Sequence, residues 1–85
     1  MKVVAVYKEE TDYARQVQDF LRDFQTQTGH EIESKDPDSP DGVDFCNAYG
    51  IIEYPTLIAI ADDGSMQNMW SGMPLPTVME ISFYV

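Results

Sequence analysis

Four aspartates in a short polar stretch are the residues of this chain whose spacing most suggests a metal-binding loop. They are Asp36, Asp38, Asp41 and Asp44. An EF-hand calcium loop needs oxygen ligands at alternating positions, a glycine at its sharp turn and a closing glutamate. Counted from Asp36, one ligand position falls on Pro40, the glycine comes one place late at Gly42, and the closing position falls on Asn47. We therefore predict no metal site, and expect these acids to complement the dipole at a helix start.

Cys46 is the only cysteine in the sequence. One thiol cannot form a disulfide within the chain, and a metal cluster built on cysteine is not expected. We expect Cys46 to lie in a helix and to behave as a small buried hydrophobe, with a reactive thiol as the alternative. His30 has no second histidine or cysteine at ligand spacing, so we expect it to be an ordinary residue of an edge strand.

The stretch 49–61 predicts how the second half of the chain folds. Gly50 can adopt the left-handed backbone that ends a helix. Pro55 holds the residue before it in an extended conformation and removes one backbone donor. Leu57–Ala61 is apolar at every position, which indicates a strand covered on both faces. Asp63-Gly64 is a strong signal for a turn into a returning strand.

An early apolar strand, Val3–Tyr7, precedes a polar loop and an amphipathic helix. The apolar residues of that helix recur at helical spacing and form one face. Thr11 or Asp12 can cap its start, and Gly29 can end it. The residues of the apolar face are Tyr13, Val17, Phe20, Leu21 and Phe24.

The remaining elements are indicated by caps and by shorter patterns. Ser39 followed by Pro40 matches the preferences of a helix N-cap and first turn. Thr77 and Glu80 fit a capping box. The predicted elements are a strand over 30–34, a helix over 40–49, a strand over 66–70 and a helix over 78–85.

The predicted order of elements is βαβαββα. A strand–helix–strand unit implies parallel neighbouring strands joined by a right-handed crossover. The later hairpin adds antiparallel strands. We therefore expect one α/β domain over residues 1–85, with a mixed four-stranded sheet and helices on both of its faces.

Composition and charge exclude several classes of partner. The chain has 85 residues, is 44% hydrophobic and carries a net charge of −10. Nucleic acid and anionic membranes both need a basic surface, so we expect neither as a partner. The first apolar run is interrupted at Lys8, so no leader peptide is predicted. No stretch approaches the ~20 apolar residues of a membrane span, and we expect a cytoplasmic protein.

The pattern Y-G-I-x-x-x-P-T, from Tyr49 to Thr56, with its apolar strand and D-G turn, resembles the second half of a thioredoxin-fold domain. The order of elements resembles the glutaredoxins in particular, whose first strand is followed by a lysine, two residues and C-P-Y-C. Here Lys8 and two glutamates precede Thr11-Asp12-Tyr13-Ala14. The resemblance covers nearly the whole chain. It implies the strand order 2-1-3-4 and a cis bond between Tyr54 and Pro55.

Both redox cysteines of that motif are replaced. Thr11 stands where the resemblance puts the nucleophile, and Ala14 stands where it puts the resolving cysteine. Thiol–disulfide exchange needs a thiolate, and a threonine hydroxyl stays protonated near neutral pH. The sequence offers no nearby base to activate it. We therefore expect no catalytic residue and no reduction of disulfides.

The resemblance also implies a groove beside the cis proline, where family members hold extended peptides through backbone hydrogen bonds. We expect a non-catalytic module that binds a peptide or protein there. The alternative is a glutaredoxin-like oxidoreductase relative that retains glutathione, with Lys8 and Arg15 attracting a carboxylate. The loop after the last strand lacks the acidic residue that the family uses for glutathione. The groove candidates are Lys8, Thr11, Asp12, Tyr13, Ala14, Tyr54, Pro55, Ser71 and Gly72.

A third hypothesis concerns the methionines near Trp70. They are expected to pack in the core and hairpin, or to form an adaptable surface that meets another chain. The residues are Met66, Met69, Met73 and Met79.

Overall fold

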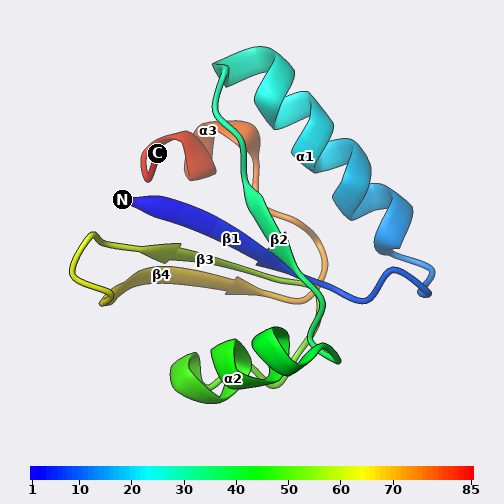
Figure 1. Ribbon diagram of the computed structural model, residues 1–85. Coiled ribbons are helices and arrows are strands. Elements are labelled where there is room, and N and C mark those ends of the chain that lie inside the picture. The colour runs from blue at the N-terminus through cyan, green and yellow to red at the C-terminus, as the bar shows by residue number, and fades with distance from the viewer.

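A four-stranded mixed sheet organises the computed structural model, which describes residues 1–85 (Figure 1). The strands lie in the order β2-β1-β3-β4. β1 is parallel to β2 and antiparallel to β3, and β3 is antiparallel to β4. This confirms the predicted fold class and strand order. The elements are β1 (Lys2–Val6), α1 (Ala14–Thr28), β2 (Glu33–Lys35), α2 (Pro40–Tyr49), β3 (Thr56–Ile60), β4 (Met66–Ser71) and α3 (Val78–Ser82).

The two central strands are buried on both faces. Successive side chains of a strand point to opposite faces of the sheet. Val3 and Ala5 of β1 therefore belong to the core under α1 and α3, while Val4 and Val6 belong to the core under α2. Figure 1 shows α1 and α3 on one side of the sheet and α2 on the other. The run of apolar residues in β3 is buried at all five positions, as expected.

Most helix ends lie where the sequence predicted them. Ser39 Oγ accepts a hydrogen bond from the Gly42 N–H (2.9 Å) and caps α2. The capping box between Thr77 and Glu80 forms at the start of α3. Gly29 and Gly50 end α1 and α2 with positive φ angles of 77° and 68°. None of the helices combines the length and apolarity needed to cross a membrane.

The start of α1 was predicted wrongly. Neither Thr11 nor Asp12 caps the helix: the N-cap is Tyr13, and its side chain makes no capping hydrogen bond. The Thr11 hydroxyl instead donates to the Lys8 carbonyl (2.7 Å), and the Ala14 N–H donates to the Thr11 carbonyl (3.2 Å). These bonds close a turn after β1, so the helix begins at Ala14.

Two other boundaries also differ from the prediction. The His30 N–H donates to Thr28 Oγ1 (3.1 Å), so His30 belongs to the link after α1. β2 therefore begins at Glu33, three residues later than expected, and His30 is not part of the edge strand. α3 ends at Ser82 rather than at the last residue, because the chain turns there and the Tyr84 N–H donates to the Ile81 carbonyl (2.9 Å).

Candidate functional site

The segments of the predicted groove meet at one end of the sheet. Val6 of β1 lies opposite Thr56 of β3, and Thr56 lies opposite Ser71 of β4. The chain beyond β1, the approach to β3 and the exit from β4 therefore come together in space. We call the set Lys8, Thr11–Ala14, Tyr54–Pro55 and Ser71–Gly72 the candidate groove.

Within this set, Pro55 and Gly72 lie side by side and are joined by a backbone hydrogen bond. The Tyr54–Pro55 bond is cis, and the Pro55 side chain is fully buried. The Gly72 N–H donates to the Pro55 carbonyl (2.7 Å), which extends the β3–β4 ladder by one pair. Gly72 has φ 75°, and a Cβ there would lie 3.0 Å from Glu53 Oε2. Only a residue without a side chain suits this position.

The backbone of Tyr54 has no hydrogen-bond partner within the chain. None of the intramolecular hydrogen bonds of the structure uses its N–H or its carbonyl. The residue lies one position before Pro55 and outside the ladder of β3, which begins at Thr56. A donor and an acceptor on one residue are what an added extended strand needs.

The side chain of Tyr54 joins the candidate groove to the loop before α2. The Lys8 ammonium lies 5.4 Å from the centre of the Tyr54 ring, within the range of a cation–π contact, and 3.7 Å from Asp38. Burial raises the pKa of the Tyr54 phenol above its ordinary value, and Cys46, Asp38 and Tyr13 raise it further. The phenol therefore stays neutral and able to donate well above physiological pH.

The segment Thr11–Ala14 carries no nucleophile that the structure activates. The Thr11 hydroxyl donates to a backbone carbonyl, which is not a general base. Ala14 is buried against Tyr7 and Val17. Asp12 is exposed and takes part in no hydrogen bond or ion pair.

Cys46 lies in α2 and is only 6% exposed. It packs in the core between α2 and the sheet, with Val4, Ile51 and Ile58. The expectation of a small buried hydrophobe agrees with this position.

Four acidic residues that we did not assign to the site border it. A hollow of about 380 Å³ beside the candidate groove is lined by polar residues alone: Lys8, Glu9, Glu10, Thr11, Asp36 and Asp38. The loop after β1 and the loop after β2 meet here because these two strands are parallel neighbours. The predicted strand–helix–strand unit could have indicated that these two loops meet, because the carboxyl ends of parallel strands lie at one edge of the sheet.

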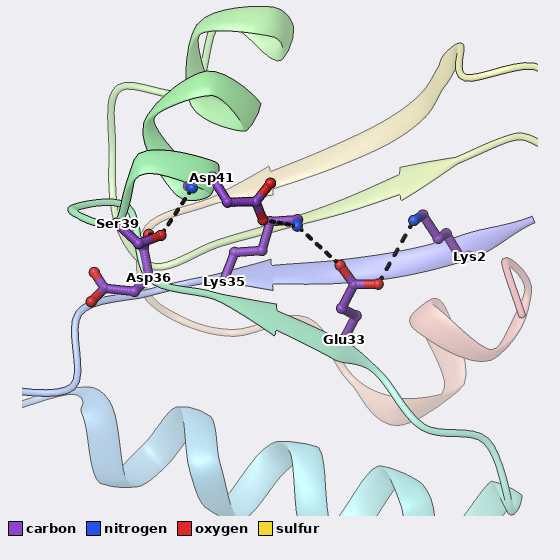
Figure 2. Close-up of polar contacts among 7 residues, drawn as sticks. Lys2, Glu33, Lys35, Asp36, Ser39 and Asp41 are labelled. Atoms are coloured by element: carbon purple, nitrogen blue, oxygen red, sulfur yellow. Dashed lines mark hydrogen bonds and ion pairs between the residues drawn. The ribbon is translucent and has the colours of Figure 1, made fainter.

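A chain of ion pairs joins the two ends of the loop between β2 and α2, which carries Asp36 and Asp38, and links them to β1 (Figure 2). Glu33 lies between Lys2 (3.7 Å) and Lys35 (3.2 Å), and Lys35 reaches Asp41 at 2.6 Å. The hydrogen bond to Asp41 raises the pKa of Lys35, so this ammonium stays charged. Two strands and the start of α2 are thereby held together beneath the loop that carries Asp36 and Asp38.

The largest hollow, about 450 Å³, lies away from this site. It is bordered by Met1, Phe45, Tyr49 and Asp62, between α2 and the amino-terminal end of β1. It contains none of the predicted site residues.

Comparisons with known proteins support the fold and no finer identity. No model of a known protein family matches the sequence, and no curated protein matches it. Among solved structures, thioredoxin 1 from the thermophilic eubacterium Thermosipho africanus TCF52B is similar, with a TM-score of 0.68. The sequences are 11% identical, and the match covers 95% of this chain and 85% of that one. The chain therefore has a thioredoxin-like fold.

Proposed function

We propose that this thioredoxin-like domain is a non-catalytic module that binds an extended peptide or protein segment along the candidate groove. The observation that carries the proposal is the backbone of Tyr54, whose N–H and carbonyl have no partner within the chain. An extended ligand can pair with both groups and can place a side chain against the exposed part of the Tyr54 ring.

The absence of an exposed thiol at the groove supports a binding role over a redox role, because the one thiol near it, Cys46, lies against Tyr54 and is only 6% exposed. Disulfide exchange proceeds through a thiolate that attacks a sulfur. Thr11 and Ala14 offer none, and Cys46 is buried in the core under α2. A binding groove depends on backbone geometry and on Tyr54, so the loss of both cysteines leaves it intact.

Glutathione binding is the second candidate, and Lys8 is the feature that favours it. An ammonium near the groove could attract one of the carboxylates of glutathione. Against this, Lys8 already lies 3.7 Å from Asp38, and the adjoining hollow is lined by four carboxylates. An anionic tripeptide would be repelled there, so we rank this candidate second.

Selection from a library of random peptides tests the proposal. Selected peptides would be titrated into isotope-labelled protein, and amide shifts and hydrogen exchange would be followed by NMR. We expect the largest shifts in Thr11–Ala14, Tyr54 and Ser71–Gly72. The Tyr54 amide should exchange rapidly in the free protein and slowly at saturation, because the ligand accepts its hydrogen bond.

A matched pair of variants separates the groove from its surroundings. Tyr54→Ala should weaken peptide binding by about tenfold or more, as expected for a central aromatic contact. Ile52→Ala, which changes a side chain that is 92% exposed two residues away, should leave the affinity unchanged. Peptides that bind with no change in Tyr54 exchange would contradict the proposal.

A further inference from the structure

The last quarter of the chain is almost without charged residues. The protein carries a net charge of −10, yet Glu80 is the only charged residue after Asp63. The carboxylate of Glu80 accepts hydrogen bonds from the N–H and the hydroxyl of Thr77. Five of the eight exposed large hydrophobic residues lie in the same stretch: Met66, Met73, Met79, Phe83 and Val85. Met66 pairs with Ile60 and therefore lies on the α2 side of the sheet, whereas Met79 and Phe83 border a hollow on the α3 side. We call the α3 side of β4, together with residues 77–85, the neutral face.

The neutral face contains a hollow and two protruding side chains. The hollow has a volume of about 270 Å³ and lies between β4 and α3. Trp70 and Tyr84 line it and pack edge to face, with ring centres 5.3 Å apart. Met79 and Phe83 stand at its border, 75% and 83% exposed. In Figure 1, α3 lies toward the amino-terminal end of β1, away from the loop after β1 that contributes to the candidate groove.

We propose that the neutral face binds a second copy of this chain about a two-fold axis. A two-fold interface must be complementary to itself, because the same surface is used by both copies: if residue i of one copy contacts residue j of the other, residue j of the first contacts residue i of the second. A hollow beside two protruding apolar side chains meets this requirement, since Phe83 of each copy can enter the hollow of the other.

The charge distribution selects a second copy as the occupant. Charged partners of either sign would gain little here, because the one carboxylate of the face is already held by Thr77. Contact between two copies through most other surfaces would bring carboxylates together, which costs free energy. The neutral face pairs with itself without that cost, and keeps the acidic surfaces of the two copies apart.

The contact uses side chains rather than the backbone of edge strand β4. The bond from the Gly72 N–H to the Pro55 carbonyl fixes the alternation of the ladder, so the Met69 N–H points away from β3. That N–H donates to Asn68 Oδ1 (2.8 Å), and the Asn68 amide donates to the Tyr84 hydroxyl (3.2 Å). Asn68 thus occupies a donor that strand pairing would need.

Sedimentation equilibrium over a wide range of protein concentrations tests the proposal. We expect a reversible monomer–dimer equilibrium in the wild type. Phe83→Asp should raise the dimer dissociation constant by about tenfold or more, because it buries a carboxylate in both copies. Ile52→Asp makes the same change of charge at a more exposed apolar residue outside the face, and should leave the constant unchanged. The emission of Trp70, the only tryptophan, should shift to the blue as the dimer forms.

Added salt distinguishes this contact from one built on ion pairs. Salt screens the repulsion between two acidic copies, so sodium chloride should strengthen dimerisation through the neutral face. A dimer weakened by salt would overturn the proposal. So would a protein that stays monomeric at all concentrations, or a dimer that Phe83→Asp leaves intact.

Discussion

At the scale of single residues, the Thr11 hydroxyl and the nearby Cys46 thiol are both engaged within the chain. The Thr11 hydroxyl donates to the Lys8 carbonyl and closes a turn (2.7 Å). Cys46 contributes to the core on the other side of the sheet from α1. Tyr54 has an unpaired backbone and a ring in contact with Lys8. In each case the group is either engaged within the chain or, for the Tyr54 backbone, left without an intramolecular partner, which is the basis of the proposed binding role.

Reduced glutathione provides a direct test at this scale. In an NMR titration to about 10 mM ligand, a concentration that would reveal even a dissociation constant of about 1 mM, we expect no shift in Thr11–Ala14, Tyr54 or Ser71–Gly72. The physical reason is the set of carboxylates around Lys8, which repel an anion that approaches its ammonium.

Two controls complete the titration. A glutathione-dependent disulfide reduction assay should give the background rate for the wild type and equally for Cys46→Ala. Saturable shifts confined to the candidate groove would instead establish a glutathione site and promote the second candidate function.

At the scale of elements, the stability of α2 depends on the close packing of its first turn against the loop after β2. Ser39 Oγ accepts from the Gly42 N–H, and the Ser39 hydroxyl donates to the Asp36 carbonyl (2.8 Å). The same carbonyl leaves no room beside Gly42, where a Cβ would lie 1.7 Å away. The acidic border of the candidate groove is therefore held by backbone contacts as well as by the ion pairs of Lys35.

Substitutions in this turn should destabilise the protein to different degrees. Gly42→Ala forces the backbone of Asp36 to move and should lower the free energy of unfolding by about 2 kcal/mol or more. Ser39→Ala removes the N-cap and should cost about 1 kcal/mol. Asn47→Ala, at an exposed position of the same helix, should have little effect. Urea denaturation followed by circular dichroism measures all three. Equal stability of Gly42→Ala and Asn47→Ala would show that the loop yields easily.

The sequence was most informative where one local signal determines an element. The apolar run of β3, the glycines that end α1 and α2, and the capping box of α3 all predicted correctly, because each acts over a few residues. The start of α1 was missed because a threonine hydroxyl can either cap a helix or donate to a nearby carbonyl. The turn after β1 brings the Lys8 carbonyl to Thr11, so its hydroxyl donates there instead of capping α1. The acidic border was missed because it joins loops far apart in the sequence.

At the scale of the whole molecule, the arrangement of charge divides the protein into two regions. Residues before Gly64 carry nearly all of the charged side chains, and the neutral face is built from some of the later residues. The shape is flat, with extents of 33 × 31 × 18 Å. The acids are therefore spread over a thin body in which most of them face solvent, and five basic residues cannot neutralise them. Ionic strength should control both the stability of the fold and the approach of other molecules.

Stability should therefore rise with salt. The Debye length is about 30 Å at 10 mM salt, close to the longest extent of the molecule, and about 8 Å at 150 mM. At low salt nearly every carboxylate repels every other, whereas at higher salt only neighbouring charges interact. Screening stabilises the folded state relative to the unfolded state, because the folded state holds the charges closer together. We expect the midpoint of thermal unfolding to increase by several degrees over this range, at about 1 kcal/mol of added stability. The measurement should be repeated with Phe83→Asp at low protein concentration, so that dimerisation does not contribute. A midpoint that falls with salt would mean that ion pairs such as Lys35–Asp41 outweigh the repulsion between the acids.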